Sequence, residues 1–149
     1  KLDKTLKKVG LTPIGLVGSV DQHSFLQLVM QGPEDKTITF LKVEDFQSDL
    51  KVPDIKLDYI TGVNYINNHS FKELINAQCM ATMESVSEAG IPTDMITINN
   101  LSEENLGFLI YYYELLASTV GIMFGINTYD QPGVEFGKKK LIKKFVKES

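Results

Sequence analysis

A histidine, a lysine and a glutamine are the side chains of this chain best suited to proton transfer or ligand binding. His23 stands two residues after Asp21, which can cap a helix. Lys138 directly follows Gly137, where a bare backbone leaves room for a ligand, and Gln131 lies in the preceding turn. Imidazole exchanges protons near neutral pH, and an ammonium stabilises a developing oxyanion. Position alone leaves two interpretations open, a functional pair or a helix-start histidine and a solvated lysine.

The other reactive side chains have structural interpretations. His69 begins a predicted helix after a loop rather than after a strand. Cys79 is the only cysteine, which excludes an intrachain disulfide and any multi-cysteine metal site, and its apolar neighbours suggest a core position. Lys138 is one of six lysines in 138–147, and we expect the other five to be solvated on an outer helix face. No metal site is predicted.

Composition and motifs exclude several classes of protein. The 149 residues are 43% hydrophobic, enough for one soluble globular domain. With 15 basic and 19 acidic residues, the net charge of −4 gives no general reason to bind nucleic acid or an anionic membrane. Dinucleotide, phosphate-loop, zinc-protease and serine-hydrolase signatures are absent. No secretory signal is visible, so we expect a cytoplasmic protein, and the start at Lys1 rather than Met suggests a trimmed chain or a fragment.

The elements that must position these side chains alternate between strand and helix. Strands are predicted at 12–18, 36–43 and 94–99 from short runs of apolar and β-branched residues. Helices are predicted from Asp21 to about Gly32, from Ser70 to Gly90, from Ser102 onward, and from Val134 to the end. Residues 44–68 lack a lasting period and are interpreted mostly as loop.

The segment 105–126 is unusual because Glu114 is its only charged residue. Its length alone would permit a membrane span. A carboxylate near the bilayer centre is costly, and a helix that is apolar all round is equally typical of a buried element. We therefore predict a core helix or a subunit contact, and no membrane association.

Alternating strands and helices predict an α/β layered fold with a parallel sheet, helices on both faces and right-handed crossovers. Ligands of such sheets lie beyond the carboxyl ends of the strands, so chemistry is expected in the loops after Gly18, Val43 and Asn99. Three strands make a thin sheet, which again suggests a fragment.

Two motifs resemble landmarks of one enzyme family. The stretch 130–138 (DQPGVEFGK) resembles the signature near the carboxyl end of glucose-6-phosphate isomerases, also called phosphoglucose isomerases. Gln22 and His23, followed by a Phe-x-Gln-Leu helix and a Gln-Gly pair, are similar to a second landmark. The resemblance covers nearly the whole chain, least securely at 44–68. Pro132 stands where many members have Trp, although some bacterial members resemble this chain at that position.

The resemblance implies a fold and a set of roles. Residues 1–149 would be the carboxy-terminal part of a sugar isomerase domain of SIS type, a three-layer αβα flavodoxin-like fold, with the active-site turn and last helix at 127–149. His23 would act on the sugar ring during opening and proton shuttling, Lys138 at the ring oxygen or C1 hydroxyl, and Gln131 as a contact to the phosphosugar. The division of ring opening between His23 and Lys138 stays open, and the reaction requires no redox cofactor.

The resemblance also implies that essential groups lie outside the chain. The base glutamate, the hydroxyl-rich phosphate loop and an arginine would all precede Lys1, so we expect these 149 residues to be inactive alone. Family members are dimers in which the histidine matching His23 enters the neighbouring subunit's site, which implies a homodimer for the intact enzyme. Two alternatives remain, an isomerase acting on another hexose phosphate such as mannose phosphate, and a non-catalytic sugar-phosphate-binding or dimerisation module.

Overall fold

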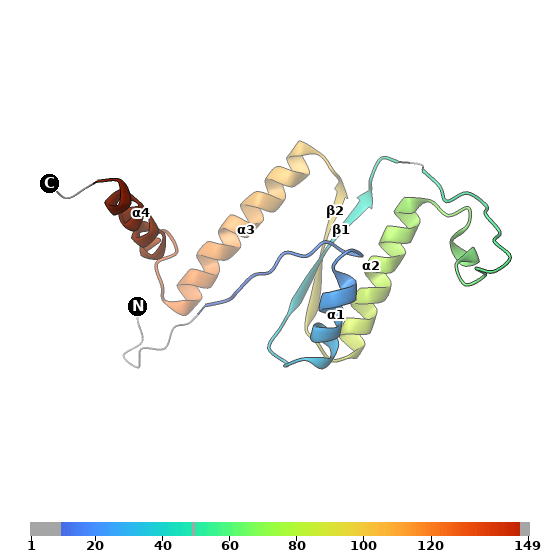
Figure 1. Cartoon of the computed structure of the whole chain (residues 1–149), viewed down its shortest axis with the longest axis horizontal. Helices are drawn as coiled ribbons and strands as arrows, with labels where there is room; N and C mark the ends of the chain where they lie inside the picture. Colours follow the sequence, from blue (N-terminus) through green and yellow to red (C-terminus); the bar gives the residue numbers. More distant parts are fainter. Residues whose placement is uncertain (1–9, 49, 147–149) are drawn as a thin grey trace. The chain divides into compact units, whose positions relative to one another are not determined.

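The computed structural model describes residues 10–48 and 50–146 of the chain (Figure 1). Its elements are α1 (Gln22–Gln31), β1 (Ile38–Asp45), the short 3-10 helix η1 (Asn64–Ile66), α2 (Phe71–Glu88), β2 (Thr93–Asn100), α3 (Glu103–Phe124) and α4 (Pro132–Phe145). The chain forms two compact units, 14–106 and the combination of 1–13 with 107–149, which are described one at a time.

The unit 14–106 is built on a parallel pair of strands joined by α2. Strands β1 and β2 run in register from Ile38 opposite Thr93 to Asp45 opposite Asn100. Helix α2 connects them and packs against both, which gives a strand–helix–strand unit. The predicted α/β fold with a parallel sheet is confirmed, as are the strands at 36–43 and 94–99, each shifted by up to two residues.

Local sequence explains where α2 begins and ends. The Ser70 hydroxyl accepts from the Glu73 N–H at 3.1 Å, and the Glu73 carboxylate accepts from the Ser70 N–H at 2.7 Å, which completes a capping box. After the last turn, Gly90 has φ +83°, a conformation that glycine adopts without strain. Val86 on this helix is fully buried, and Val29 on α1 is 5% exposed. The core of this unit is therefore small.

The prediction of a strand at 12–18 is wrong. Residues 11–17 have no regular secondary structure, and 18–21 form a turn. Ile14 and Val17 are more than 60% exposed, so the described residues leave this apolar run uncovered. A strand exists only where another strand pairs with it, and the sheet in the described ranges has two strands, not three.

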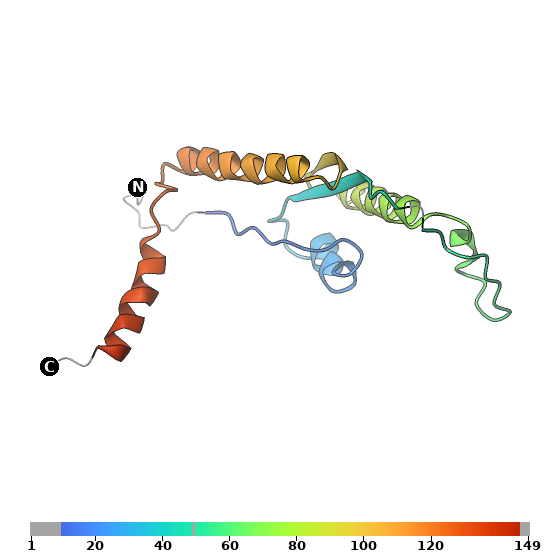
Figure 2. The same ribbon diagram turned by 90° about the horizontal axis from the view of Figure 1, so that it is seen from above.

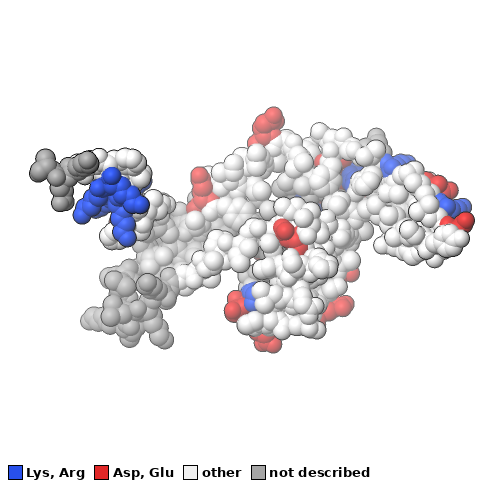
Figure 3. All heavy atoms as spheres, in the orientation of Figure 1, with Lys and Arg blue, Asp and Glu red and all other residues white. Residues whose placement is uncertain are grey.

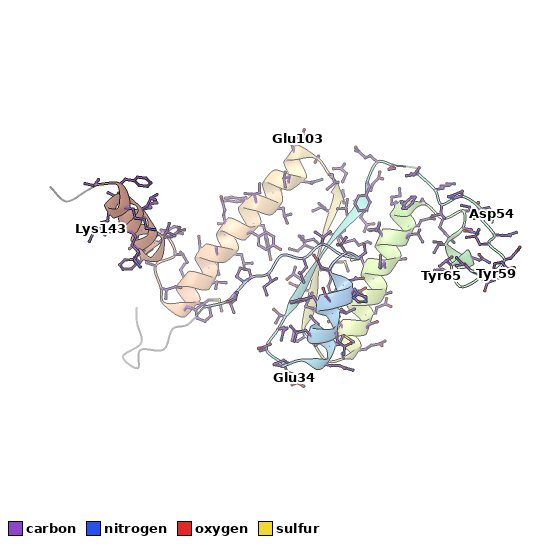
Figure 4. All side chains as sticks on the ribbon, in the orientation of Figure 1. Glu34, Asp54, Tyr59, Tyr65, Glu103 and Lys143 are labelled. Carbon is purple, nitrogen blue, oxygen red and sulfur yellow. The ribbon has the colours of Figure 1, made fainter. Side chains whose placement is uncertain are left out.

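Residues 46–69 connect β1 to α2 and extend beyond the start of that helix (Figures 1 and 2). A single antiparallel bridge between Lys51 and Ser70 fixes the base of this connection. The Asn67 side chain donates to the Ile55 carbonyl at 2.9 Å. This hydrogen bond closes the tip of the connection. Tyr59 and Tyr65, labelled in Figure 4, are 98% and 76% exposed. The prediction that residues 44–68 are mostly loop is confirmed, apart from Glu44 and Asp45, which end β1, and the one turn of η1.

Helix α3 opens as predicted at Ser102, whose hydroxyl accepts from the Asn105 N–H at 3.2 Å. By length and composition alone, this helix is long and apolar enough to cross a membrane. Only 6% of its most apolar stretch is buried. Burial of α3 in a core, one of the two alternatives predicted for it, is therefore not observed within the described residues.

Candidate active site

His23 is the second residue of α1 and is exposed. Asp21 occupies the cap position but does not cap, because its side chain accepts from the Val17 N–H at 2.7 Å instead. The Asp21 N–H in turn donates to the Val17 carbonyl at 3.1 Å, and Ser19 between them has φ +70°. Two hydrogen bonds between Val17 and Asp21 therefore hold together the ends of the turn that precedes His23. Within the described ranges, the His23 imidazole has no hydrogen bond or ion pair, which leaves both ring nitrogens available.

The neighbour of His23 makes the polar contact between α1 and α2. The Gln22 side-chain amide donates to the Thr82 hydroxyl at 2.9 Å, and its oxygen accepts from the Gln78 amide at 3.3 Å. Thr82 donates onward to the Gln78 carbonyl at 2.8 Å. Sequence reasoning missed this cluster, because Gln22 and Thr82 are separated by 60 residues and no local pattern links them.

Gln131, Glu135 and Lys138 lie along one face of α4, since spacings of four and three residues return to the same side of a helix. Gln131 is the cap residue, and its carbonyl accepts from the Val134 N–H at 3.0 Å. The Lys138 ammonium lies 2.7 Å from a Glu135 carboxylate oxygen, and both side chains are more than half exposed. All three residues are exposed, so a site formed by them would be open to solvent in this structure.

The turn that leads into Gln131 is folded tightly against the end of α3. Gly125 has φ +65°, and the Ile126 N–H donates to the Gly121 carbonyl at 2.9 Å. The Tyr129 hydroxyl donates to the Ser118 hydroxyl at 2.9 Å. A Cβ built on Gly121 would lie 1.9 Å from the Thr128 methyl, so only glycine fits there. These contacts position the start of α4.

The lysines of α4 gather into one basic region, seen as a blue cluster over that helix in Figure 3. Lys143, one of them, is labelled in Figure 4. Among the described side chains of this cluster, Lys138 is the one with a carboxylate partner. It therefore differs in surroundings from Lys139, Lys140 and Lys144.

At the carboxyl ends of the strands, where ligand contacts were expected, the polar groups are paired with one another. The Lys72 ammonium lies 3.3 Å from Asp45, and the Asn105 amide donates to the Asn100 side chain at 2.8 Å. The Gln47 N–H and then the Lys72 ammonium hold the pKa of Asp45 below its usual range. Sequence reasoning did not single out these residues.

Two shallow, largely apolar hollows lie along α3, and both include Glu114 and Ala117. Neither is lined by His23, Gln131 or Lys138. Across 10–48 and 50–146, no three His, Cys, Asp or Glu side chains come close enough together to hold a metal ion. His23 belongs to the unit 14–106, and Gln131 and Lys138 belong to the other unit.

The parallel strand pair and its connecting helices define an α/β protein. A crystal structure of a hypothetical protein from Thermus thermophilus has the same fold, with a TM-score of 0.86 and 28% identity over 99% of this chain and 35% of that one. Residues 4–149 match the phosphoglucose isomerase family. The chain belongs to the phosphoglucose isomerase family, as its two motifs predicted.

The similar proteins include named isomerases from bacteria. Glucose-6-phosphate isomerase from Campylobacter jejuni is 52% identical over 133 residues, which are 89% of this chain and 32% of that protein. Glucose-6-phosphate isomerase from Rubrobacter xylanophilus is 44% identical over 130 residues, 87% of this chain and 30% of that protein. The chain thus spans about a third of the length of these relatives.

Proposed function

We propose that this chain provides one part of the active site of a glucose-6-phosphate isomerase. The observation that supports this most directly is the family match over residues 4–149, together with 52% identity to a relative named glucose-6-phosphate isomerase. Both predicted motifs lie inside the matched range. The substrates would be glucose 6-phosphate and fructose 6-phosphate, interconverted in the cytoplasm within glycolysis and gluconeogenesis.

The reaction would proceed in two stages. The ring opens when an acid protonates the ring oxygen while a base removes the proton of the C1 hydroxyl. A carboxylate then moves one proton between C2 and C1 through an enediol, so no electron acceptor is consumed. His23 suits either role in ring opening because an imidazole can donate or accept a proton, and within the described ranges neither of its ring nitrogens has a partner.

Lys138 and Gln131 would act from the same face of α4. The Lys138 ammonium would stabilise negative charge at the ring oxygen or C1 hydroxyl, and the Gln131 amide would hydrogen-bond to the phosphosugar. Glu135 lies 2.7 Å from Lys138 and limits where that ammonium points. The base for the C1–C2 transfer and the phosphate loop are assigned to parts of the enzyme outside these 149 residues.

The proposal includes a homodimer for the complete enzyme. Helix α3 supports this part, because it is apolar on all sides and exposed across almost its whole length. Such a surface is normally covered in a soluble protein.

A coupled assay of the full-length gene product tests the proposal, with fructose 6-phosphate as substrate. His23→Ala and Lys138→Ala should each lower kcat by about a hundredfold or more, since removal of an acid–base group typically costs ~10²–10⁴-fold. His69→Ala and Lys140→Ala are matched controls and should retain most of the activity. Turnover of mannose 6-phosphate instead would favour a different hexose phosphate, and saturable binding without turnover would favour the sugar-phosphate-binding module.

A further inference from the structure

We propose that Gln22 is a positioning residue for His23, a role that rests on the proposed function of His23. The two residues are adjacent at the start of α1. Gln22 reaches α2 with both ends of its amide, whereas the imidazole of His23 has no partner within the described ranges. The fixed side chain is therefore the glutamine, and the free one is the histidine.

The partners of the Gln22 side chain require both a donor and an acceptor, which an amide supplies. Its nitrogen donates to Thr82 at 2.9 Å, and its oxygen accepts from Gln78 at 3.3 Å. Because the Thr82 proton is used toward the Gln78 carbonyl, the hydroxyl oxygen is left to accept from Gln22. A carboxylate at position 22 could not donate, and an aliphatic side chain could do neither.

Helix geometry converts this attachment into a direction for His23. Successive residues of an α-helix are rotated by about 100°, so when Gln22 faces α2 the side chain of His23 is directed about 100° from that contact. Gln78 and Thr82 are one turn apart on α2, which restricts both rotation and sliding of the first turn of α1. The Asp21–Val17 contacts restrict the chain on the other side.

For function, the attachment of Gln22 to α2 fixes the position of the His23 imidazole. An exposed histidine with no side-chain partner can act on a substrate only if its backbone is held in place. Thr82 and Gln78 thus determine where His23 meets the sugar without contacting it. Loss of this attachment should lower turnover more than binding, because substrate is held largely by other groups.

The test uses matched variants in the full-length gene product. Thr82→Val keeps the shape of the side chain but removes the hydroxyl, and Gln22→Leu removes the amide. Each variant should lower kcat by about tenfold and change KM by less than about twofold. The reason is that misplacement of a reacting group costs up to ~10²-fold in rate. Thr82→Ser retains the hydroxyl and should recover at least half of the wild-type kcat. Equal kcat for Thr82→Val and Thr82→Ser would overturn the proposal.

A second measurement separates this proposal from the proposed function. The imidazole Cε1–H NMR signal of His23, identified by its loss in His23→Ala, should shift in Gln22→Leu and Thr82→Val but not in Thr82→Ser. The signal of His69, which precedes α2, should stay in place and so report that α2 is intact. If the wild-type protein does not isomerise, the proposed function fails while these shifts still support positioning. An unchanged His23 signal, or equal shifts of both histidines, would contradict the positioning role.

Discussion

The carboxylate of Glu73 is the clearest case in which the structure changes the chemistry of a single group. The Ser70 backbone N–H and then the Ser70 hydroxyl hold the pKa of Glu73 below its usual range, with smaller help from His69 and Lys51. Both hydrogen bonds favour the charged form. A depressed pKa in the folded state stabilises the protein above the unfolded-state pKa, and this contribution is lost as the pH falls through the folded-state value.

We expect Ser70→Ala to raise the pKa of Glu73 toward its ordinary value, because the hydroxyl donor at 2.9 Å is lost. A ¹³C NMR titration of the glutamate side chain measures this directly. Ser85→Ala removes a hydroxyl that bonds only to the Ala81 carbonyl, so it should leave the Glu73 titration unchanged. An identical Glu73 midpoint in wild type and Ser70→Ala would contradict the assignment.

The thiol of Cys79 offers a second measurement on one residue. Burial raises the pKa of Cys79, while the nearby Lys42 ammonium acts in the opposite direction. Since the thiolate is the reactive form, the native chain should react with a thiol reagent at pH 8 about tenfold or more slowly than the denatured chain. Lys42→Met should slow the native reaction further. Equal rates before and after denaturation would show that Cys79 is not protected.

At the scale of elements, the turn between α3 and α4 depends on the absence of a side chain at Gly121. We expect Gly121→Ala to lower the free energy of unfolding by about 1–3 kcal/mol, because the new methyl would overlap the Thr128 methyl. Gly107 is the matched control, since it lies in the same helix with open space around it. Gly107→Ala should stabilise by roughly 0.5–1 kcal/mol.

Chemical denaturation followed by far-ultraviolet circular dichroism provides both values. Adding Thr128→Ala to Gly121→Ala should restore part of the loss, because it removes the atom at 1.9 Å. If Gly121→Ala and Gly107→Ala behave alike, the close approach of the turn to α3 is not a constraint on this region.

At the scale of the whole molecule, the described residues leave most of their large apolar side chains exposed. Val29 and Val86 are the buried hydrophobic residues of the described ranges, and most large apolar side chains along α3 and α4 are 38–81% exposed. A chain with so little buried area gains little from folding alone. We therefore infer that its stability depends on surfaces supplied by further polypeptide.

We expect the purified 149-residue chain to show no measurable isomerisation of glucose 6-phosphate, because the carboxylate base and phosphate loop of the proposed mechanism lie outside it. The same preparation should bind a hydrophobic dye such as anilinonaphthalene sulfonate strongly, through the exposed face of α3. The full-length gene product should bind the dye weakly and catalyse the reaction. Substantial turnover by the short chain would overturn the assignment of the base.

Local sequence determined the elements whose stabilising contacts lie close along the chain. The capping box at Ser70 and Glu73, the alternation in β1 and β2, and the stop at Gly90 each depend on residues a few positions apart. The family membership also came from short motifs, since 130–138 keeps its residues in one unbroken stretch. The pair Glu135 and Lys138 could have been predicted from helical spacing alone.

Tertiary structure decided whatever depends on a partner distant in sequence. The run 12–18 has the composition of a strand but no strand beside it, and Asp21 has the position of a cap but bonds to Val17. Gln22 meets Thr82 only because β1 and α2 bring residues 60 positions apart into contact. Hydrogen bonds extend only about 3 Å, so long-range partners follow from packing and not from pattern.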